Sequence, residues 1–295
     1  MNVLIIGATG YVGTAIDEAL AAHGHHTIGT ARSETAHQRL AARGTAIVLA
    51  DAAKPATLGS AVRTADAVVY AVSITDDDPW TVEKRALRAI AKSLAGTEKT
   101  FVYVSGAWVY GETGSVPATE ESPLNPPRSV MRRAELERES LAMTRIGVRA
   151  LNVRPGIVYG RGAGMPAMFV QSARERGAAT VVGDGHNRWA TIDARDLGEF
   201  VALAIERGRP GRAYNAVNDD HYTMRAIAEA ASRGAGANGA VSLVPPELMG
   251  HYGECLSLDQ CVSSQRAQEH LNWRPSRPSI IEELERGSYA DALIA

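Results

Sequence analysis

A short apolar run followed by a glycine-rich turn opens the chain, and no other feature constrains its fold as strongly. Asn2–Ile6 has the pattern of a buried strand, and Gly7, Gly10 and Gly13 then lead into an amphipathic segment that ends near His23. In such a turn the first glycine permits the bend, the second lets a pyrophosphate approach the backbone, and the third lets the helix pack on the strand. The helix N-terminus also offers N–H groups to phosphates. We therefore interpret residues 7–13, the glycine turn, as a dinucleotide-binding loop rather than an ordinary strand-to-helix turn.

Apolar runs alternate with helical patterns along the rest of the chain. The sequence predicts strands at 25–30, 45–50, 66–73, 101–105 and 148–153, and helices at 80–94, 128–143 and 197–207. This alternation predicts an α/β fold with a Rossmann-type, doubly wound parallel sheet that binds ligands beyond its C-terminal strand ends. We expect one compact unit: residues 1–160 as the nucleotide-binding region and 161–295 mainly as a smaller C-terminal substrate-binding region, with about 190–215 returning to the main sheet.

The composition excludes several classes of partner. The 31 Lys and Arg residues nearly balance the 33 Asp and Glu residues, so the net charge of −2 creates no field that attracts nucleic acid or an anionic membrane. The two cysteines, Cys255 and Cys261, argue against a disulfide framework or a metal site. No apolar stretch approaches the ~20 residues of a membrane helix. We expect a cytoplasmic protein that acts on a small molecule.

The residues after the second predicted strand indicate which dinucleotide binds. An acidic residue there would hold the ribose hydroxyls of NAD and repel an added phosphate. Here Arg32 and Ser33 follow the strand, and no carboxylate precedes Glu34. Arginine pairs with a 2′-phosphate and serine can donate a hydrogen bond to it. The sequence therefore predicts NADP(H) in preference to NAD(H), with a solvated arginine at a helix start as the alternative.

The G-x-x-G-x-x-G spacing of the glycine turn resembles the short-chain dehydrogenase/reductase superfamily, specifically its extended branch of epimerases, dehydratases and reductases. Arg154–Gly160 resembles the R-P-x-x-x-Y-G stretch that passes under the nicotinamide in that branch. The resemblance spans Met1 to about Arg277, and it implies a homodimer formed through the helices near 80–95 and 128–145. The cofactor contacts that it implies are Gly7, Thr9, Gly10, Tyr11, Val12, Gly13, Asp51, Ala52, Ala71, Val72, Pro155, Gly156, Ile157 and Val158.

The catalytic motif of that branch is missing here. Its chemistry uses Tyr-x-x-x-Lys on one helix face, where the lysine lowers the pKa of the tyrosine that transfers the proton. One register places Ser129 and Arg133 at these positions, and the other gives Val130 and Ala134. No lysine follows Lys99 in the sequence, so neither register restores the pair. We place the chain among the atypical members of the superfamily.

Three residues remain as catalytic candidates. Tyr110 is the nearest tyrosine and is predicted to donate the proton, with a packed turn residue as the alternative. Ser105, one position before Gly106 at the family's serine position, is predicted to contact the substrate or the nicotinamide amide; the alternative is a hydroxyl bonded to backbone. Arg133 is predicted to hold the nicotinamide ribose, but its pKa above ~12 excludes it as a base. Its alternative is a solvated arginine in the basic run 128–133.

A further block, residues 181–197, resembles a turn and strand in the substrate-binding region of extended members. In nucleotide-sugar enzymes of that type, an arginine matching Arg188 meets the substrate phosphates, and Trp189 follows it here. The alternative is structural: Asp193 and Asp196 would cap the helix that begins at Leu197. Arg188 and Arg195 would then be the ion-pair partners of these aspartates.

The sequence supports three functions. The leading prediction is an NADP-dependent oxidoreductase of atypical short-chain type that acts on a small carbonyl or alcohol, with Tyr110 or a bound water supplying the proton. An enzyme of this kind should enclose a pocket between Trp108, Tyr110 and Trp189. The second is a nucleotide-sugar epimerase or dehydratase, and the third is a non-catalytic, redox-sensing regulator that binds NADP.

Overall fold

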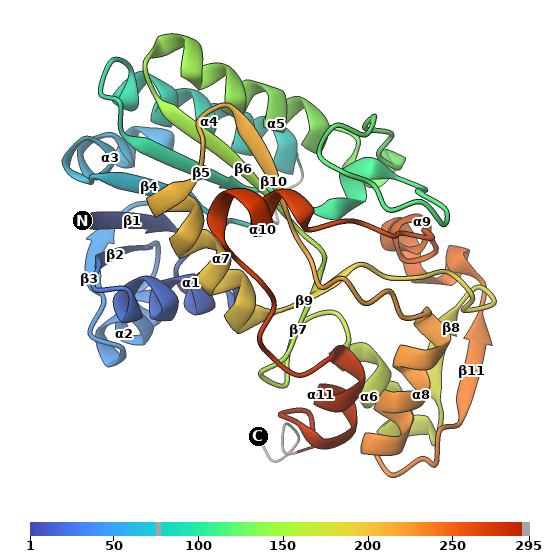
Figure 1. Ribbon diagram of the computed structural model, residues 1–295. Coiled ribbons are helices and arrows are strands. Elements are labelled where there is room, and N and C mark those ends of the chain that lie inside the picture. The colour runs from blue at the N-terminus through green and yellow to red at the C-terminus, as the bar shows by residue number, and fades with distance from the viewer. Residues whose placement is uncertain (75–77, 291–295) are drawn as a thin grey trace.

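The computed structural model describes residues 1–74 and 78–290 and is built on a parallel seven-stranded sheet with the order β10-β6-β5-β4-β1-β2-β3 (Figure 1). Its strands are β1 (Asn2–Ile6), β2 (His26–Ala31), β3 (Ala46–Leu49), β4 (Ala67–Tyr70), β5 (Thr100–Val104), β6 (Arg149–Pro155) and β10 (Arg212–Ala216). Every adjacent pair of strands runs parallel. The predicted α/β fold with a doubly wound sheet is therefore confirmed.

Side chains that alternate along each strand supply a hydrophobic core on both faces of the sheet. On β1, Val3 and Ile5 enter one core, while Leu4 and Ile6 enter the other. A parallel sheet buried on both faces requires such a continuous apolar run. The first core is covered by α1 (Tyr11–Ala22), α2 (Glu34–Ala42), α7 (Ala194–Arg207) and α10 (Gln265–Leu271). The second is covered by α3 (Gly59–Thr64), α4 (Pro79–Leu94) and α5 (Arg133–Ala142).

A smaller region lies below the main sheet in Figure 1 and has its own hydrophobic core. The chain enters it after β7 (Ile157–Tyr159), returns to the main sheet through β9 (Thr191–Asp193), α7 and β10, and then enters it again. Its elements are α6 (Ala167–Arg176), β8 (Ala179–Val182), α8 (Met224–Gly234), β11 (Val241–Val244), α9 (Gly253–Leu256) and α11 (Ile280–Arg286). The short 3₁₀ helices are Pro55–Thr57, Ala107–Tyr110, Arg128–Val130, Met143–Ile146 and Pro246–Tyr252.

Several predicted elements differ from the structure at their ends, and two of these differences involve residues predicted at the site. The helix predicted at 128–143 divides into a 3₁₀ turn at 128–130 and α5, which begins at Arg133. Ser129 and Val130 are weaker helix formers than the Ala-Glu-Leu-Glu run that follows Arg133. The strand predicted at 66–73 ends at Tyr70, so Ala71 and Val72 lie in the loop beyond β4.

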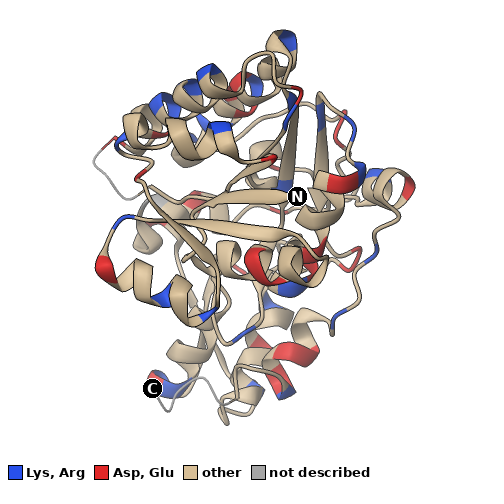
Figure 2. Ribbon diagram, turned by 90° about the vertical axis from the view of Figure 1, so that its left-hand side faces the viewer, with Lys and Arg blue, Asp and Glu red and all other residues tan. Residues whose placement is uncertain are grey.

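The surface carries charges of both signs. Figure 2 shows Lys and Arg interspersed with Asp and Glu over the helices. Within residues 1–74 and 78–290, no helix combines the length and apolarity that crossing a membrane demands.

Candidate functional site

A cavity of about 480 Å³ lies beyond the carboxyl ends of β1, β4, β5 and β6. This is the edge of a parallel sheet at which ligands bind in doubly wound folds. One wall comes from the glycine turn, a second from the strand ends, and a third from the loop after β7. The lining residues are Gly10, Tyr11, Val12, Ala71, Val72, Ser73, Val104, Ser105, Gly106, Ala107, Trp108, Arg133, Pro155, Gly156, Ile157, Val158, Gly164, Met165 and Gln260.

The three glycines of the glycine turn have different neighbours. Gly7 has a φ of +100°, and a Cβ there would lie 2.3 Å from the Ala71 carbonyl oxygen. A Cβ on Gly13 would lie 2.0 Å from the Gly7 oxygen, whereas one on Gly10 would meet only that oxygen, at 3.3 Å. Gly7 and Gly13 therefore permit close packing, and Gly10 borders the cavity. No side chain caps the N-terminus of α1, so this end of the cavity fits a pyrophosphate.

An arginine from the end of α2 braces the glycine turn. Arg43 donates hydrogen bonds from Nη2 to the Ala8 carbonyl oxygen (2.8 Å) and from Nη1 to Thr14 Oγ1 (2.7 Å). Its Nε lies 3.3 Å from Asp17 Oδ2, which also accepts a hydrogen bond from Thr45. Arg43 lies 35 residues from Ala8 along the chain and belongs to no local motif, so this contact could not be predicted from the sequence.

The residues predicted at the adenosine end lie beyond the ends of β2 and β3, outside the cavity lining. Ser33 Oγ accepts a hydrogen bond from the Ala36 N–H (3.2 Å) and caps α2. Arg32 is exposed and makes no ion pair or hydrogen bond to another described side chain. Asp51 accepts a hydrogen bond from the Ala53 N–H (3.0 Å). The guanidinium of Arg32 is thus available to an anion.

Arg133 lines the cavity and is held by buried partners. Its Nη1 donates to Glu83 Oε1 (3.0 Å) and to the Tyr103 hydroxyl (2.8 Å), and Tyr103 donates to the same carboxylate oxygen (2.9 Å). The guanidinium lies over the Trp80 ring, 5.3 Å from its centroid. Burial raises the pKa of the Glu83 carboxyl. Arg133 is therefore not the solvated arginine of the alternative interpretation.

Ser105 and Gln260 form the neighbouring wall. Ser105 Oγ is buried and has no hydrogen-bond partner among the described residues, so the alternative of a backbone-bonded hydroxyl is wrong. Gln260 comes from the segment after α9 and donates from Nε2 to the carbonyl oxygens of Ala107 (3.1 Å) and Gly111 (2.8 Å). Gln260 was not predicted in any site, because its partners lie about 150 residues away and no local pattern connects them.

The structure does not bring Tyr110 to the cavity. It is 2% exposed, and its hydroxyl donates to Asn215 Oδ1 (2.7 Å) and accepts from Arg154 Nη1 (2.7 Å). Arg154 also binds the buried carboxylate of Glu137, with Nη2 2.6 Å from Oε2. Burial raises the pKa of Tyr110 to about 12. The 3₁₀ turn that follows β5 directs this ring into the interior, which matches the packed alternative.

Arg188 and Trp189 also lie outside the cavity lining, so the pocket predicted between Trp108, Tyr110 and Trp189 retains only Trp108. Arg188 pairs with Asp259, with Nε 2.8 Å from Oδ1 and Nη2 2.5 Å from Oδ2. The prediction that its ion-pair partner is Asp193 or Asp196 is wrong. Trp189 is 2% exposed and packs in the core of the smaller region.

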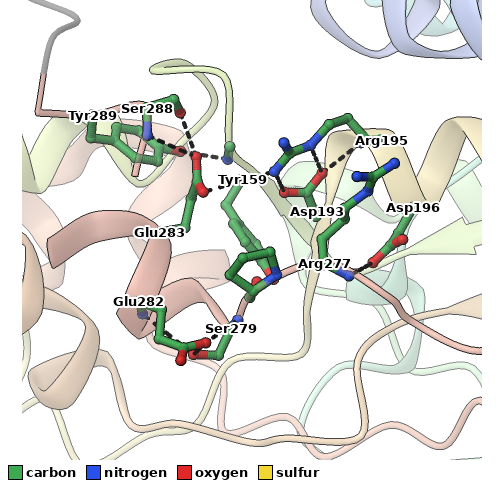
Figure 3. Close-up of polar contacts among 12 residues, drawn as sticks. Tyr159, Asp193, Arg195, Asp196, Arg277, Ser279, Glu282, Glu283, Ser288 and Tyr289 are labelled. Atoms are coloured by element: carbon green, nitrogen blue, oxygen red, sulfur yellow. Dashed lines mark hydrogen bonds and ion pairs between the residues drawn. The ribbon is translucent and has the colours of Figure 1, made fainter. Parts of the chain in front are cut away.

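Of the two predicted cap residues of α7, only one caps the helix (Figure 3). Asp193 accepts a hydrogen bond from the Arg195 N–H (2.7 Å) and pairs with the Arg195 guanidinium, as predicted. Asp196 instead accepts hydrogen bonds from the backbone N–H groups of Ser276 and Arg277, both at 3.0 Å. It therefore attaches the C-terminal segment to α7, a contact between residues 80 positions apart.

The same C-terminal segment supports the third wall of the cavity. The Tyr289 hydroxyl accepts a hydrogen bond from the Gly160 N–H (2.9 Å) and donates to the Ala163 carbonyl oxygen (2.6 Å). From the other side, the Tyr11 hydroxyl donates to the Gly160 carbonyl oxygen (2.9 Å). The loop after β7 is thus fixed between the glycine turn and the C-terminal segment, and this position brings Gly164 to the cavity.

Comparisons of sequence find similar proteins along nearly the whole chain. The model of the NAD dependent epimerase/dehydratase family matches residues 3–217. A UDP-glucose 4-epimerase from Mycolicibacterium smegmatis is 24% identical over 302 residues, which cover 93% of this chain and 94% of that protein. An uncharacterized protein from Schizosaccharomyces pombe is 27% identical over 299 residues, which cover 98% of this chain and all (100%) of that protein.

Comparisons of structure give the same fold. A dTDP-glucose 4,6-dehydratase double mutant from Streptomyces venezuelae, solved with NAD bound, has a TM-score of 0.84 at 20% identity and covers 100% of this chain and 98% of its own. The UDP-glucose 4-epimerase of Thermus thermophilus in complex with NAD has a TM-score of 0.81 at 21% identity, and the match covers 99% of this chain and 100% of that one. At these identities the similarity establishes the architecture alone.

Proposed function

The chain belongs to the NAD dependent epimerase/dehydratase family, and within it we propose an NADP-dependent oxidoreductase that acts on a small carbonyl or alcohol. One observation carries this proposal. A single cavity connects the N-terminus of α1, which fits a pyrophosphate, with Ser105 and Arg133. A dinucleotide and a small substrate that share this cavity would lie against each other, as hydride transfer requires.

The chain's own residues divide the binding of NADP among them. The glycine turn and the start of α1 would hold the pyrophosphate, and Arg32 would pair with the 2′-phosphate. Pro155–Val158 would contact the nicotinamide end, and Arg133 would hold its ribose. Once bound, the nicotinamide supplies or accepts the hydride.

Arg133 and Ser105 then act on the substrate. A guanidinium remains charged at neutral pH, so Arg133 stabilises the negative charge that develops on a carbonyl oxygen but does not supply a proton. The Ser105 hydroxyl orients the substrate. Because Tyr110 lies outside the cavity, a bound water supplies the proton, which was the other donor that the sequence analysis allowed.

The lining also bears on the two alternatives. Among the described lining residues there is no carboxylate, histidine, lysine or cysteine, and the only tyrosine, Tyr11, donates its hydroxyl proton to Gly160. Epimerisation and dehydration need a side-chain acid or base close to the substrate, which counts against the nucleotide-sugar alternative. The engagement of Arg188 with Asp259 counts against it too. The same lack of acid and base residues favours the regulator as the second candidate.

A cofactor titration followed by a turnover assay tests the proposal. Binding of NADPH and NADH to the purified protein is followed by fluorescence, and NADPH oxidation is then measured with a panel of aldehydes and ketones. We expect tighter binding of NADPH, turnover of at least one carbonyl, and loss of that turnover in Arg133→Ala. Arg188→Ala, which changes an arginine outside the cavity, should retain it. Binding of NADPH without turnover would favour the regulator, and failure to bind either dinucleotide would overturn the proposal.

A further inference from the structure

The side chain of Gln260 has a fixed orientation at the cavity. It is 4% exposed, and its Nε2 lies within hydrogen-bond distance of two backbone carbonyl oxygens, those of Ala107 and Gly111. A carbonyl oxygen can only accept, so the atom facing both of them must be the amide nitrogen. Both N–H groups of Gln260 are thereby used, and Oε1 is the only polar atom of the side chain left for a ligand.

Two oxygen atoms on this wall have no partner. Gln260 Oε1 accepts no hydrogen bond from a described residue and is not fully buried. Ser105 Oγ is buried without a hydrogen bond to any described residue. Leaving a buried polar atom unpaired costs about 1–3 kcal/mol, and buried polar atoms are seldom left so. Both residues line the same cavity, as does Ala107, whose carbonyl oxygen accepts a hydrogen bond from Gln260. A donor group on a ligand in the cavity can therefore pair with Gln260 Oε1 directly, whereas the Ser105 hydroxyl must turn toward the cavity to pair with a ligand.

The rest of this wall is apolar. Trp108, Ile157 and Met165 line it, and the ring of Tyr252 lies 6.1 Å from that of Trp108 between centroids. Arg133 carries the only formal charge among the described lining residues. Such a wall suits an uncharged, largely apolar molecule, and an accepting oxygen in it suits a molecule that carries a hydrogen-bond donor.

We propose that Gln260 is a specificity-determining residue that accepts a hydrogen bond from a hydroxyl or N–H group on the substrate, assisted by Ser105. This inference deepens the proposed function and rests on it for turnover. An analogue with a methyl group in place of the donor would leave Oε1 buried and unpaired. Sites built to bind a substrate hydroxyl or N–H group reject such analogues strongly.

Paired aldehydes of equal shape test the inference. NADPH-dependent reduction is measured for 3- and 4-(hydroxymethyl)benzaldehyde and for 3- and 4-ethylbenzaldehyde, which differ only in a hydroxyl or methyl group. We expect kcat/KM of the wild-type protein to favour a hydroxymethyl compound by at least about tenfold. Gln260→Met keeps the length of the side chain without the accepting oxygen. In this variant kcat/KM for the hydroxymethyl and ethyl compounds should differ by less than about threefold. Equal rates in the wild-type protein, or an unchanged preference in Gln260→Met, would overturn the inference.

Two further measurements separate folding and turnover from specificity. Gln260→Met also loses the donors to Ala107 and Gly111, so its melting temperature and its NADPH affinity are measured alongside. Ser105→Ala removes only an unpaired hydroxyl, should fold normally, and should reduce the preference in part. If no aldehyde is turned over, the role of Gln260 is tested by comparing the binding of 1,4-benzenedimethanol and 4-ethylbenzyl alcohol to the NADPH complex. Preferred binding of the diol would support the role of Gln260 although the oxidoreductase had failed, and equal binding would refute it.

Discussion

The two ends of the cavity are built in different ways. At the end formed by the glycine turn, the proposed cofactor end, the geometry comes from backbone. Glycines pack against carbonyl groups, and the start of α1 faces the cavity without a capping side chain. At the proposed substrate end, formed by Ser105, Arg133 and Gln260, the geometry comes from side chains of distant segments: Arg133 is held by Glu83, and Gln260 is held by Ala107. A fold that binds a dinucleotide fixes the first end, whereas the second can exchange one set of side chains for another while the fold is kept.

The largest expected effect is at the packing glycines. Gly13→Ala places a Cβ 2.0 Å from the Gly7 oxygen, so the turn must move. The variant should lose NADPH binding and about 3 kcal/mol or more of the free energy of unfolding. Gly10→Ala is the matched control, because its Cβ meets only one backbone atom, at 3.3 Å. It should melt near the wild-type temperature but bind NADPH at least about tenfold more weakly, because the methyl group occupies space that the pyrophosphate needs. Titration calorimetry measures the NADPH affinity of both variants, and thermal melting measures their stability. Equal losses of stability in Gly13→Ala and Gly10→Ala would contradict this division of roles.

A second prediction concerns the proposed substrate end, where Arg133 and the buried Glu83 form an ion pair. Arg133→Met leaves the Glu83 carboxylate buried without its cation, and we expect a loss of about 3 kcal/mol in the free energy of unfolding. Adding Glu83→Gln removes the unpaired charge and should restore most of that loss. Urea unfolding of the single and double variants measures both values. The idea fails if the double variant is no more stable than Arg133→Met alone.

A third prediction tests whether Arg32 alone binds the 2′-phosphate of NADPH. Arg32→Ala should weaken NADPH binding about tenfold and leave NADH binding unchanged, because a charge-assisted pair to phosphate contributes about 1.5 kcal/mol. Added salt should reduce the difference between the NADPH and NADH affinities of the wild-type protein. Arg39→Ala removes another exposed arginine of the same segment, in α2, and should change neither affinity. Equal losses for NADPH and NADH in Arg32→Ala would argue against a phosphate site there.

The sequence predicted most of the fold, because the fold depends on patterns within a few neighbouring residues. The glycine spacing and the alternating strands and helices were visible without the structure, and the cavity lies where a doubly wound sheet predicts it. The cap of α7 by Asp193 was visible in the same way. Errors at element ends, such as the start of α5 at Arg133, arise because 3₁₀ turns and helices share similar local patterns.

The substrate end could not be predicted to the same extent. Tyr110 was chosen because it is close in sequence to the strand end, yet Asn215, 105 residues away, accepts a hydrogen bond from its hydroxyl in the interior. Arg188 was assigned to nearby aspartates, and Asp259, 71 residues away, holds it instead. Gln260 had no local signal at all. Contacts of this kind depend on how distant segments fold onto one another, and a single sequence contains no pattern that pairs them.

The smallest expected effect lies behind the cofactor end, where α1 packs on α7. His23, at the C-terminus of α1, contacts Glu199 through Nε2 (2.8 Å) and Glu206 through Nδ1 (2.9 Å), and His25 also contacts Glu206. Burial lowers the pKa of His23, but its hydrogen bonds to Glu206 and Glu199 outweigh burial and raise it above 6.5. Burial acts to raise the pKa of Glu206, but hydrogen bonds from the two histidines lower it below 4.5.

These two shifts set the pH range in which the contact is strongest. The contribution of His23 to the free energy of unfolding is complete below pH 6.5 and is lost as the pH rises through its raised folded-state pKa. That of Glu206 is present above pH 4.5 and is lost as the pH falls through its lowered one. Because the pairs are partly exposed, raising the pH from about 6 to about 8.5 should lower the melting temperature by only about 1–2 °C. His23→Gln should remove this difference and leave NADPH affinity unchanged, since the contact lies at the end of α1 away from the glycine turn. A pH-dependent loss of affinity that disappears in His23→Gln would instead show that packing behind the sheet controls the cofactor end.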